Sequence, residues 1–172
     1  MKKILILGLE KSGKTSIVLN FIGKTNLSNY IPINESKSPN IIIFEKDNLK
    51  FKILDFRGNE GNRNEFLKNF NEIINDTEEI FYVINVQDFK NYELALNFLQ
   101  EIIERIKKLN MKIEFTIFLH KYDPDLFEHF QQINIEIIDS LIGKIKQIIP
   151  KESFHEIYKT TIYTVLDKIH VY

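Results

Sequence analysis

The chain contains no cysteine. The missing thiols exclude a disulfide framework, a thiolate metal site and a cysteine nucleophile. The 172 residues nevertheless suit a single domain, because a chain of this size buries roughly 70% of its unfolded surface and needs no cross-link to fold. A cysteine-free chain fits a reducing compartment, so we expect a cytoplasmic protein.

Long hydrophobic runs and an excess of positive charge are also missing. The apolar run Ile4–Leu7 is too short for a signal-peptide core, and no stretch approaches the roughly 20 apolar residues of a membrane span. The formal net charge is −1, which does not favour nucleic acid or an anionic membrane as a partner. Lys2 in place of glycine and the ending Val171-Tyr172 also predict that the chain carries no lipid anchor of its own.

Strand-like and helix-like segments alternate, which is typical of a parallel sheet with helical crossovers. The strand candidates are Lys2–Leu7, Ile41–Lys46, Phe51–Asp55, Glu79–Val86, Glu114–Leu119 and Ser153–Ile157. The helix candidates are Lys14–Phe21, Asn64–Ile74, Tyr92–Leu109, Ile135–Ile149 and Thr160–Val171. A turn at Asp47-Asn48-Leu49 predicts that the second and third strands pair in antiparallel fashion. We therefore expect an α/β fold in one domain spanning residues 1–172, with a six-stranded, mainly parallel sheet flanked by about five helices.

Residues Gly8–Thr15 match the phosphate-binding loop in full and lie between an apolar strand and a helix. Gly8 and Gly13 let the backbone curl and aim its N–H groups at phosphates, and the start of the following helix attracts the same anion. Lys14 is placed to reach the β- and γ-phosphates, while the Thr15 hydroxyl is a ligand for Mg²⁺. The expected phosphate-binding residues are Gly8, Lys11, Ser12, Gly13, Lys14, Thr15 and Ser16.

A second motif, Asp55–Gly58, follows the third strand candidate. That strand would carry Asp55 to the carboxyl edge of the sheet beside Thr15, where a carboxylate can hold Mg²⁺ through water. Gly58 would bring a backbone N–H to a γ-phosphate. The pattern alone also fits a solvated turn, and it is the phosphate-binding loop that favours the metal interpretation.

A third motif, His120–Asp123, comes directly after an apolar strand candidate. The Asp123 carboxylate can accept hydrogen bonds from N1 and the exocyclic amine of guanine, a pair of donors that adenine does not offer. The Lys121 stem can lie along the base. Alone, these residues also fit a charged turn after a buried strand. With the phosphate-binding loop, they disfavour an ATP-using kinase or ATPase.

The order and spacing of the three motifs resemble the Ras-like superfamily of GTPases. His120 stands where most of that superfamily has asparagine, and in this the chain is similar to the Rag/Gtr GTPases. Longer stretches resemble the Rag C/D branch in particular, namely Gly8–Ile17, Ile53–Gly58 and Tyr82–Asp88. The resemblance extends from Lys2 to Ile169 and is weakest between Lys24 and Asn40.

The resemblance implies a switch that cycles between GTP and GDP with Mg²⁺ and hydrolyses GTP slowly. It implies that the backbone at Ile157 contacts guanine O6. It also implies that two switch segments, the first at Lys24–Asn40 and the second at Phe56–Phe66, order around a γ-phosphate. Expected protein partners are another GTPase, a roadblock-type protein, a GTPase-activating protein or an exchange factor. The alternative is a non-hydrolysing G domain that scaffolds a partner GTPase.

The chain departs from the family pattern at the residues expected to support catalysis. Asn59 follows Gly58 where the family has the glutamine that orients the attacking water. The expected catalytic residues are therefore Lys14, Gly58 and Asn59, and the shorter Asn59 predicts slow or lost hydrolysis.

Two further departures concern the metal and the domain organisation. No threonine aligns in the first switch, where Ser36, Lys37 and Ser38 compete; only a serine could ligate Mg²⁺, and Ser38 is the candidate that would join Thr15 and Asp55. The chain also stops after its last helix candidate, without the C-terminal roadblock-type domain of the family. We therefore expect a G domain alone.

Overall fold

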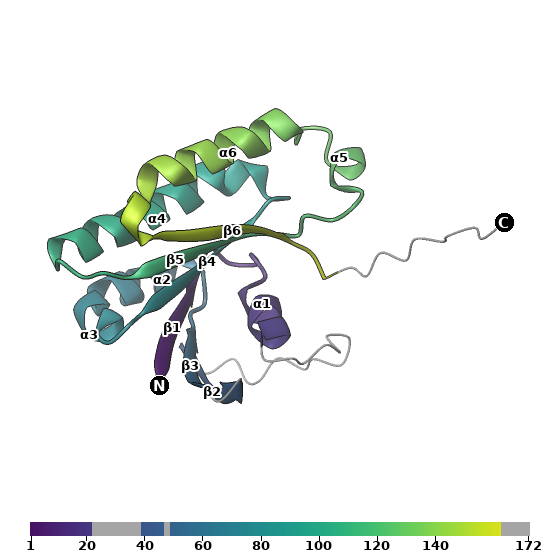
Figure 1. The fold of residues 1–172 in the computed structure, drawn as a ribbon. Coiled ribbons are helices and arrows are strands. Elements are labelled where there is room, and N and C mark those ends of the chain that lie inside the picture. Colours follow the sequence, from purple (N-terminus) through teal and green to yellow (C-terminus); the bar gives the residue numbers. More distant parts are fainter. Residues whose placement is uncertain (22–38, 47–48, 163–172) are drawn as a thin grey trace.

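A computed structural model describes residues 1–21, 39–46 and 49–162. The described residues form a six-stranded sheet in the order β2-β3-β1-β4-β5-β6 (Figure 1). The strands are β1 Lys2–Leu7, β2 Asn40–Lys46, β3 Leu49–Asp55, β4 Glu79–Asn85, β5 Glu114–His120 and β6 Phe154–Thr160. Strands β2 and β3 are antiparallel, and the other neighbouring pairs are parallel. The predicted α/β class and mixed sheet are thereby confirmed.

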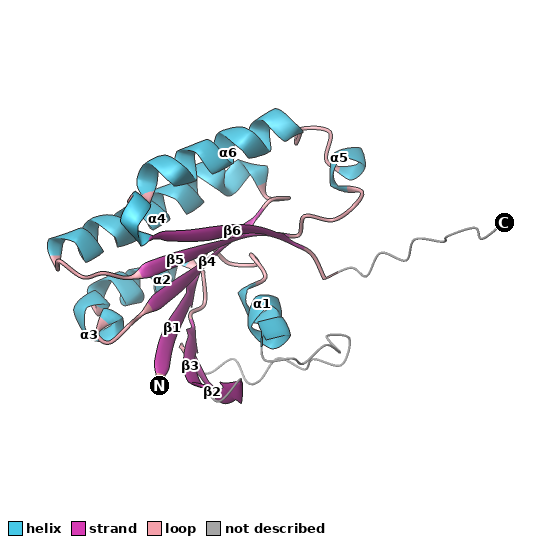
Figure 2. Ribbon diagram, viewed as in Figure 1, coloured by secondary structure: helices cyan, strands magenta, loops and turns pink. Residues whose placement is uncertain are grey.

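Helices cover both faces of this sheet. Helix α1 packs on one face, and α2, α3, α4 and α6 pack on the other, as Figure 2 shows. The helices are α1 Lys14–Phe21, α2 Glu60–Lys68, α3 Phe70–Ile74, α4 Tyr92–Lys108, α5 Leu126–His129 and α6 Ile135–Ile148, with short 3₁₀ turns η2 Phe89–Asn91 and η3 Lys151–Ser153. The result is a three-layer fold with the sheet in the middle.

The double covering explains why the central strands are continuous apolar runs rather than alternating ones. In β1, Ile4 and Ile6 pack on the side of α1, while Leu5 and Leu7 join the larger core on the side of α4. Successive side chains of a strand point to opposite faces, so helical layers on both faces bury consecutive residues, as at Ile4–Leu7. The carboxyl ends of these strands meet at one edge, where the three sequence motifs begin.

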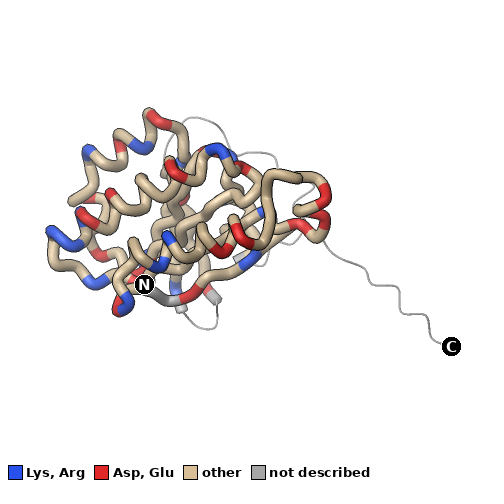
Figure 3. The backbone as a smooth tube through the Cα atoms, turned by 90° about the horizontal axis from the view of Figure 1, so that it is seen from above, with Lys and Arg blue, Asp and Glu red and all other residues tan. Residues whose placement is uncertain are grey.

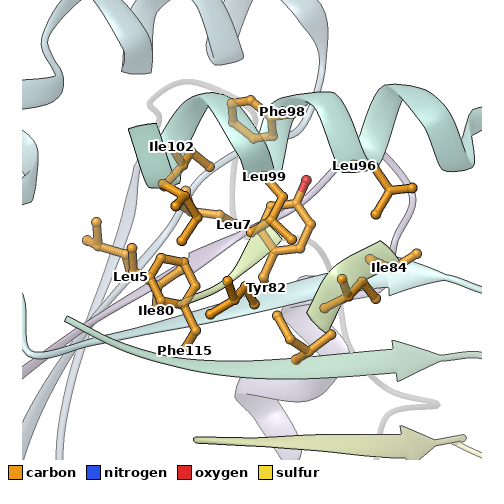
Figure 4. Packing of buried hydrophobic residues seen from close by; sticks show 14 of the residues in the cluster. Leu5, Leu7, Ile80, Tyr82, Ile84, Leu96, Phe98, Leu99, Ile102 and Phe115 are labelled. Atoms are coloured by element: carbon orange, nitrogen blue, oxygen red, sulfur yellow. The ribbon is translucent and has the colours of Figure 1, made fainter. Parts of the chain in front are cut away.

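The larger core contains Tyr82, which is fully buried on β4. Its hydroxyl donates a hydrogen bond to the Ala95 carbonyl at 2.6 Å, which ties β4 to α4. Burial raises the pKa of the Tyr82 hydroxyl, so the group keeps the proton that this bond requires. Leu99 and Ile102 of α4 belong to the same cluster (Figure 4).

Two predicted helices differ from the structure. The candidate Asn64–Ile74 begins earlier and divides at Asn69, which ends α2 and precedes α3. Asparagine is a weak helix former that favours helix ends, which accounts for the break. The candidate helix beginning at Thr160 is wrong at its start, because Thr160 pairs with His120 as the last residue of β6. Residues 161–162 of that candidate are not helical either, and residues 163–171 lie outside the described residues, as do Asp47 and Asn48 of the predicted turn.

The outer surface carries charges of both signs. Figure 3 shows lysine and arginine interspersed with aspartate and glutamate along the helices. Ion pairs join some of these residues. For example, Lys144 Nζ of α6 lies 2.5 Å from Glu93 Oε1 of α4. No helix within the described ranges has both the length and the apolar character needed to cross a membrane.

Truncation to alanine should affect the stability of the fold differently at two leucines on α4. Leu99 is 0% exposed and Leu94 is 44% exposed. Leu99→Ala should lower the free energy of unfolding by about 2–5 kcal/mol, because it leaves a cavity between α4 and the sheet. The matched change Leu94→Ala should alter it by less than about 0.5 kcal/mol. Urea unfolding of the two variants checks this, and similar losses in both would contradict the packing described here.

Candidate nucleotide-binding site

The phosphate-binding loop predicted at Gly8–Thr15 joins the end of β1 to the start of α1. Gly8 and Gly13 have φ angles of 143° and 92°, which L side chains rarely adopt. A Cβ at Gly8 would lie only 2.3 Å from the carbonyl oxygen of Val83 on β4. The loop therefore curls tightly against the sheet, and this position requires glycine.

Lys14 lies across the loop rather than in solvent. Its Nζ donates hydrogen bonds to the carbonyl oxygens of Leu9 at 2.8 Å and Gly8 at 3.2 Å. Burial lowers the pKa of Lys14 to about 8, and the negative charges of Asp55 and Glu10 oppose this shift only in part. A bound phosphate would stabilise the charged ammonium, so the site is suited to an anion.

Thr15 and Asp55 meet as the sequence predicts. Asp55 ends β3 and pairs with Ile6 of β1, which brings its carboxylate to the start of α1. The Thr15 hydroxyl donates a hydrogen bond to Asp55 Oδ2 at 2.9 Å. Burial raises the pKa of Asp55, against the effects of the Thr15 hydrogen bond and the Lys14 charge. Two hard oxygen atoms thus lie side by side; the third proposed metal ligand, Ser38, lies outside the described residues.

Gly58 of the second motif packs directly on the phosphate-binding loop. Its carbonyl accepts hydrogen bonds from the Glu10 N–H at 3.0 Å and from Arg63 Nη1 at 2.6 Å. A Cβ at Gly58 would lie 2.1 Å from the carbonyl carbon of Leu9. Only glycine allows this approach, which places the start of the second switch against the phosphate-binding loop.

His120 joins the third motif to the same loop. The side chain is 3% exposed, and its Nδ1 lies 2.9 Å from Thr160 Oγ1. A Cβ on Gly13 would meet His120 Cδ2 at 2.1 Å, so the imidazole lies against the bare backbone of the loop. Burial, followed by the charge of Lys121, lowers the pKa of His120, which favours the neutral ring.

The Asp123 carboxylate is bound by two side chains that lie just beyond the ends of β4 and β6. Its Oδ2 accepts a hydrogen bond from Gln87 Nε2 at 2.5 Å, and its Oδ1 accepts one from Thr161 Oγ1 at 2.5 Å. Gln87 Nε2 also donates to the Lys121 carbonyl at 3.1 Å. The carboxylate proposed to read the base thus has a defined orientation.

These residues fit a nucleoside phosphate with Mg²⁺. The hydroxyl of Ser12 is buried in the loop and has no hydrogen-bond partner among the described residues. The loop's glycines leave its backbone bare, and Thr15 with Asp55 offers hard oxygen ligands. Within the described ranges no three histidine, cysteine, aspartate or glutamate residues gather as a metal site. Magnesium is usually bound by one or two protein oxygens together with substrate phosphates and water.

A family model for the Gtr1/RagA G protein conserved region matches residues 3–168. The chain belongs to the Gtr1/RagA family. The resemblance to Rag/Gtr GTPases is thereby confirmed, while the Rag C/D branch stays a prediction. No curated protein matches the chain.

Comparison with solved structures shows the fold. The Arl6 BBS3 small GTPase from Trypanosoma brucei with bound nucleotide analogue GppNp is 18% identical to the chain, with a TM-score of 0.60. The match covers 94% of this chain and 87% of that chain. In total 1352 chains of solved structures match. A fold this common does not specify one function, so the function of this Gtr1/RagA family member must be argued from its site.

Asn59 of this G domain has a structural role that the sequence reasoning missed. It is the N-cap of α2, and its Oδ1 accepts hydrogen bonds from the Asn62 backbone N–H at 2.9 Å and from Asn62 Nδ2 at 2.7 Å. Asparagine before a helix with Glu60 in the first turn is a recognisable capping pattern. The amide oxygen predicted to orient water is thus engaged at the helix start.

Other residues contact the third motif, His120–Asp123, the proposed base-reading motif, without having been predicted. Ile157, the residue proposed to contact guanine O6, lies within β6 and pairs with Ile117. Thr160 and Thr161, at the end of that strand, contact the motif through their hydroxyls, and the contact of Ile157 with guanine stays a prediction. Gln87 was also missed. Its position just after β4, at the edge where strand ends gather, is the signal that could have identified it.

Gly13 allows a direct test of the site in this Gtr1/RagA domain. Gly13→Ala forces a side chain onto a backbone with φ of 92° and against the His120 ring. We expect affinity for fluorescent GDP to fall about 5- to 150-fold, since strain of this kind costs about 1–3 kcal/mol. Gly143→Ala on α6 is the control, because its Cβ would meet nothing within 4 Å. Unchanged GDP affinity in folded Gly13→Ala would contradict the assignment.

Proposed function

We propose that the chain is a guanine-nucleotide switch of Rag/Gtr type, which binds GTP and GDP with Mg²⁺ and hydrolyses GTP slowly. The observation that carries the proposal is the packing of the base-reading motif on the phosphate-binding loop through His120 and Gly13. This contact fixes the distance between a phosphate cradle and the Asp123 carboxylate. A ligand that fits both must carry phosphates at one end and a pair of hydrogen-bond donors at the other.

The phosphate end would be bound by the backbone N–H groups of Gly8–Thr15 and by the Lys14 ammonium. Thr15 and, through water, Asp55 would hold Mg²⁺, which when bound neutralises phosphate charge. Ser38 is the proposed third ligand.

The base end would be bound by Asp123 and Lys121. The ionised Asp123 carboxylate accepts only, so it pairs with N1–H and the exocyclic amine of guanine, while adenine presents an unprotonated N1. The Lys121 stem lies along the base. A charged acceptor that pairs with guanine and is left without donors by adenine discriminates strongly against the wrong base.

Slow hydrolysis is supported by the environment of Asn59. Its amide oxygen is engaged in capping α2, and the side chain is one methylene shorter than glutamine. A misplacement near 1 Å can reduce a rate on the order of 100-fold. Arg63 contacts the Gly58 carbonyl and lies 5.8 Å from the Phe98 ring centroid, so its guanidinium is already engaged.

The same observation favours a second candidate function. If the capping role of Asn59 excludes it from water orientation altogether, the chain is a G domain that binds GTP and scaffolds a partner GTPase. Under either function, the proposed partners are another GTPase, a roadblock-type protein, a GTPase-activating protein or an exchange factor, in the cytoplasm. An arginine supplied by such a partner would raise the rate of GTP hydrolysis by about 10³- to 10⁵-fold.

Base choice tests the proposed function directly. The unmodified chain should bind GDP far more tightly than ADP. Asp123→Ala should lower GDP affinity by about 30- to 700-fold, corresponding to about 2–4 kcal/mol, and leave ADP affinity unchanged. Asp125→Ala is a matched control, because that nearby carboxylate is half exposed and pairs with His129. Calorimetric titration of the variants with both nucleotides checks this; equal affinity for GTP and ATP in the unmodified chain would refute the base assignment.

Single-turnover hydrolysis separates the slow enzyme from the scaffold. We expect the unmodified chain to hydrolyse bound GTP slowly and Asn59→Gln to be faster, by about tenfold or more, provided that the second switch accepts the longer side chain. Asn59→Ser is the control, because serine preserves the helix cap without an amide. It should be no faster than the unmodified chain.

Two other outcomes have distinct meanings. Brisk hydrolysis by the unmodified chain, undiminished in Asn59→Ser, would mean that a different residue orients the water. Tight GTP binding without hydrolysis in any of the three proteins would favour the scaffold.

A further inference from the structure

The Gln87 side chain contacts both the Lys121 backbone and the Asp123 side chain through hydrogen bonds. We propose that Gln87 is a positioning residue for guanine selectivity, which holds the Asp123 carboxylate in the plane that pairs with the base. This inference rests on the proposed function and deepens it. It assigns the selectivity to the turn after β4 as well as to the third motif.

The backbone around Gln87 is fixed to the sheet. Asn85 pairs with His120 across β4 and β5, and the Val86 N–H donates to the His120 carbonyl at 3.0 Å. The Gln87 N–H donates to Asn85 Oδ1 at 3.0 Å, and the Tyr92 hydroxyl donates to the Val86 carbonyl at 2.5 Å. The turn therefore has a rigid position relative to the end of β5, where the base-reading motif starts.

The orientation of the Gln87 amide follows from its partners. Nε2 donates to Asp123 Oδ2 at 2.5 Å and to the Lys121 carbonyl at 3.1 Å. A carboxylate and a carbonyl only accept hydrogen bonds, so the amide nitrogen must face them and both of its hydrogens are used. The Lys121 carbonyl belongs to a residue with φ of 61°, an uncommon backbone for a side-chain-bearing residue that this bond helps to hold.

The remaining capacity of Asp123 matches guanine. A carboxylate has about four acceptor sites. Gln87 occupies one site on Oδ2, and Thr161 Oγ1 occupies one on Oδ1 at 2.5 Å. Counting these two bonds between described residues, one site on each oxygen is left for the two donors of the base. Because Gln87 is neutral, it orients the carboxylate without cancelling the charge that attracts N1–H.

The test variant removes the hydrogen-bond donor of residue 87 and keeps the volume of the side chain. Gln87→Met is close to isosteric but has no N–H donor. In calorimetric titrations with Mg²⁺, GDP affinity should fall about tenfold, as expected for a hydrogen bond to a charged group, while ADP affinity stays within about twofold. In an Asp123→Ala background the same change should have no further effect on GDP affinity. Gln100→Met is the matched control, because Gln100 donates to Glu104 on the exposed side of α4 at 3.0 Å.

The outcomes separate this inference from the proposed function. Unchanged GDP affinity in Gln87→Met, or an equal loss for GDP and ADP, would overturn the positioning role while the unmodified chain's preference for GDP stands. If the unmodified chain shows no preference for GDP over ADP, the proposed function fails and the positioning role fails with it.

Discussion

The structure depends on the close packing of one turn, Gly8–Thr15, against three neighbours that leave no room for a Cβ. The Val83 carbonyl bounds it at Gly8, the His120 ring bounds it at Gly13, and Gly58 packs on it from the second switch. His120 ends β5, Gly58 lies just beyond the end of β3, and Val83 lies near the carboxyl end of β4. The parallel sheet brings these ends to one edge, so the fold builds the site by bringing the motifs to the same turn.

This packing also determines the electrostatics of the site. Lys14 is buried by the loop that it stabilises, which lowers its pKa to about 8, and burial raises the pKa of Asp55. The charged form of each group is therefore less stable here than it would be in water. A phosphate beside Lys14 and a cation beside Asp55 would each stabilise the charged form of its neighbour. Ligands of opposite charge would thus offset the cost of burying these two groups.

Much of the fold and site could be predicted because the local sequence patterns agree with the packing of the folded chain. The central strands are apolar on both faces, and the phosphate-binding loop has a fixed spacing. What could not be predicted depends on contacts between distant residues. Thr160 was expected to start a helix, but pairing with His120 makes it the end of β6. Asn59 resembles a shortened catalytic residue in sequence and caps α2 in the structure. Gln87 has no motif of its own, since only the register of β4 on β5 brings it to Asp123.

The identity of the nucleotide that copurifies with the chain tests the central claim most directly. The chain would be purified in Mg²⁺ without added nucleotide and denatured, and the released small molecules would be separated by chromatography against guanine and adenine standards. A site in which Asp123 is held beside the phosphate-binding loop predicts that GDP or GTP is released. Release of an adenine nucleotide, or of none even after incubation with GDP and Mg²⁺, would contradict the account.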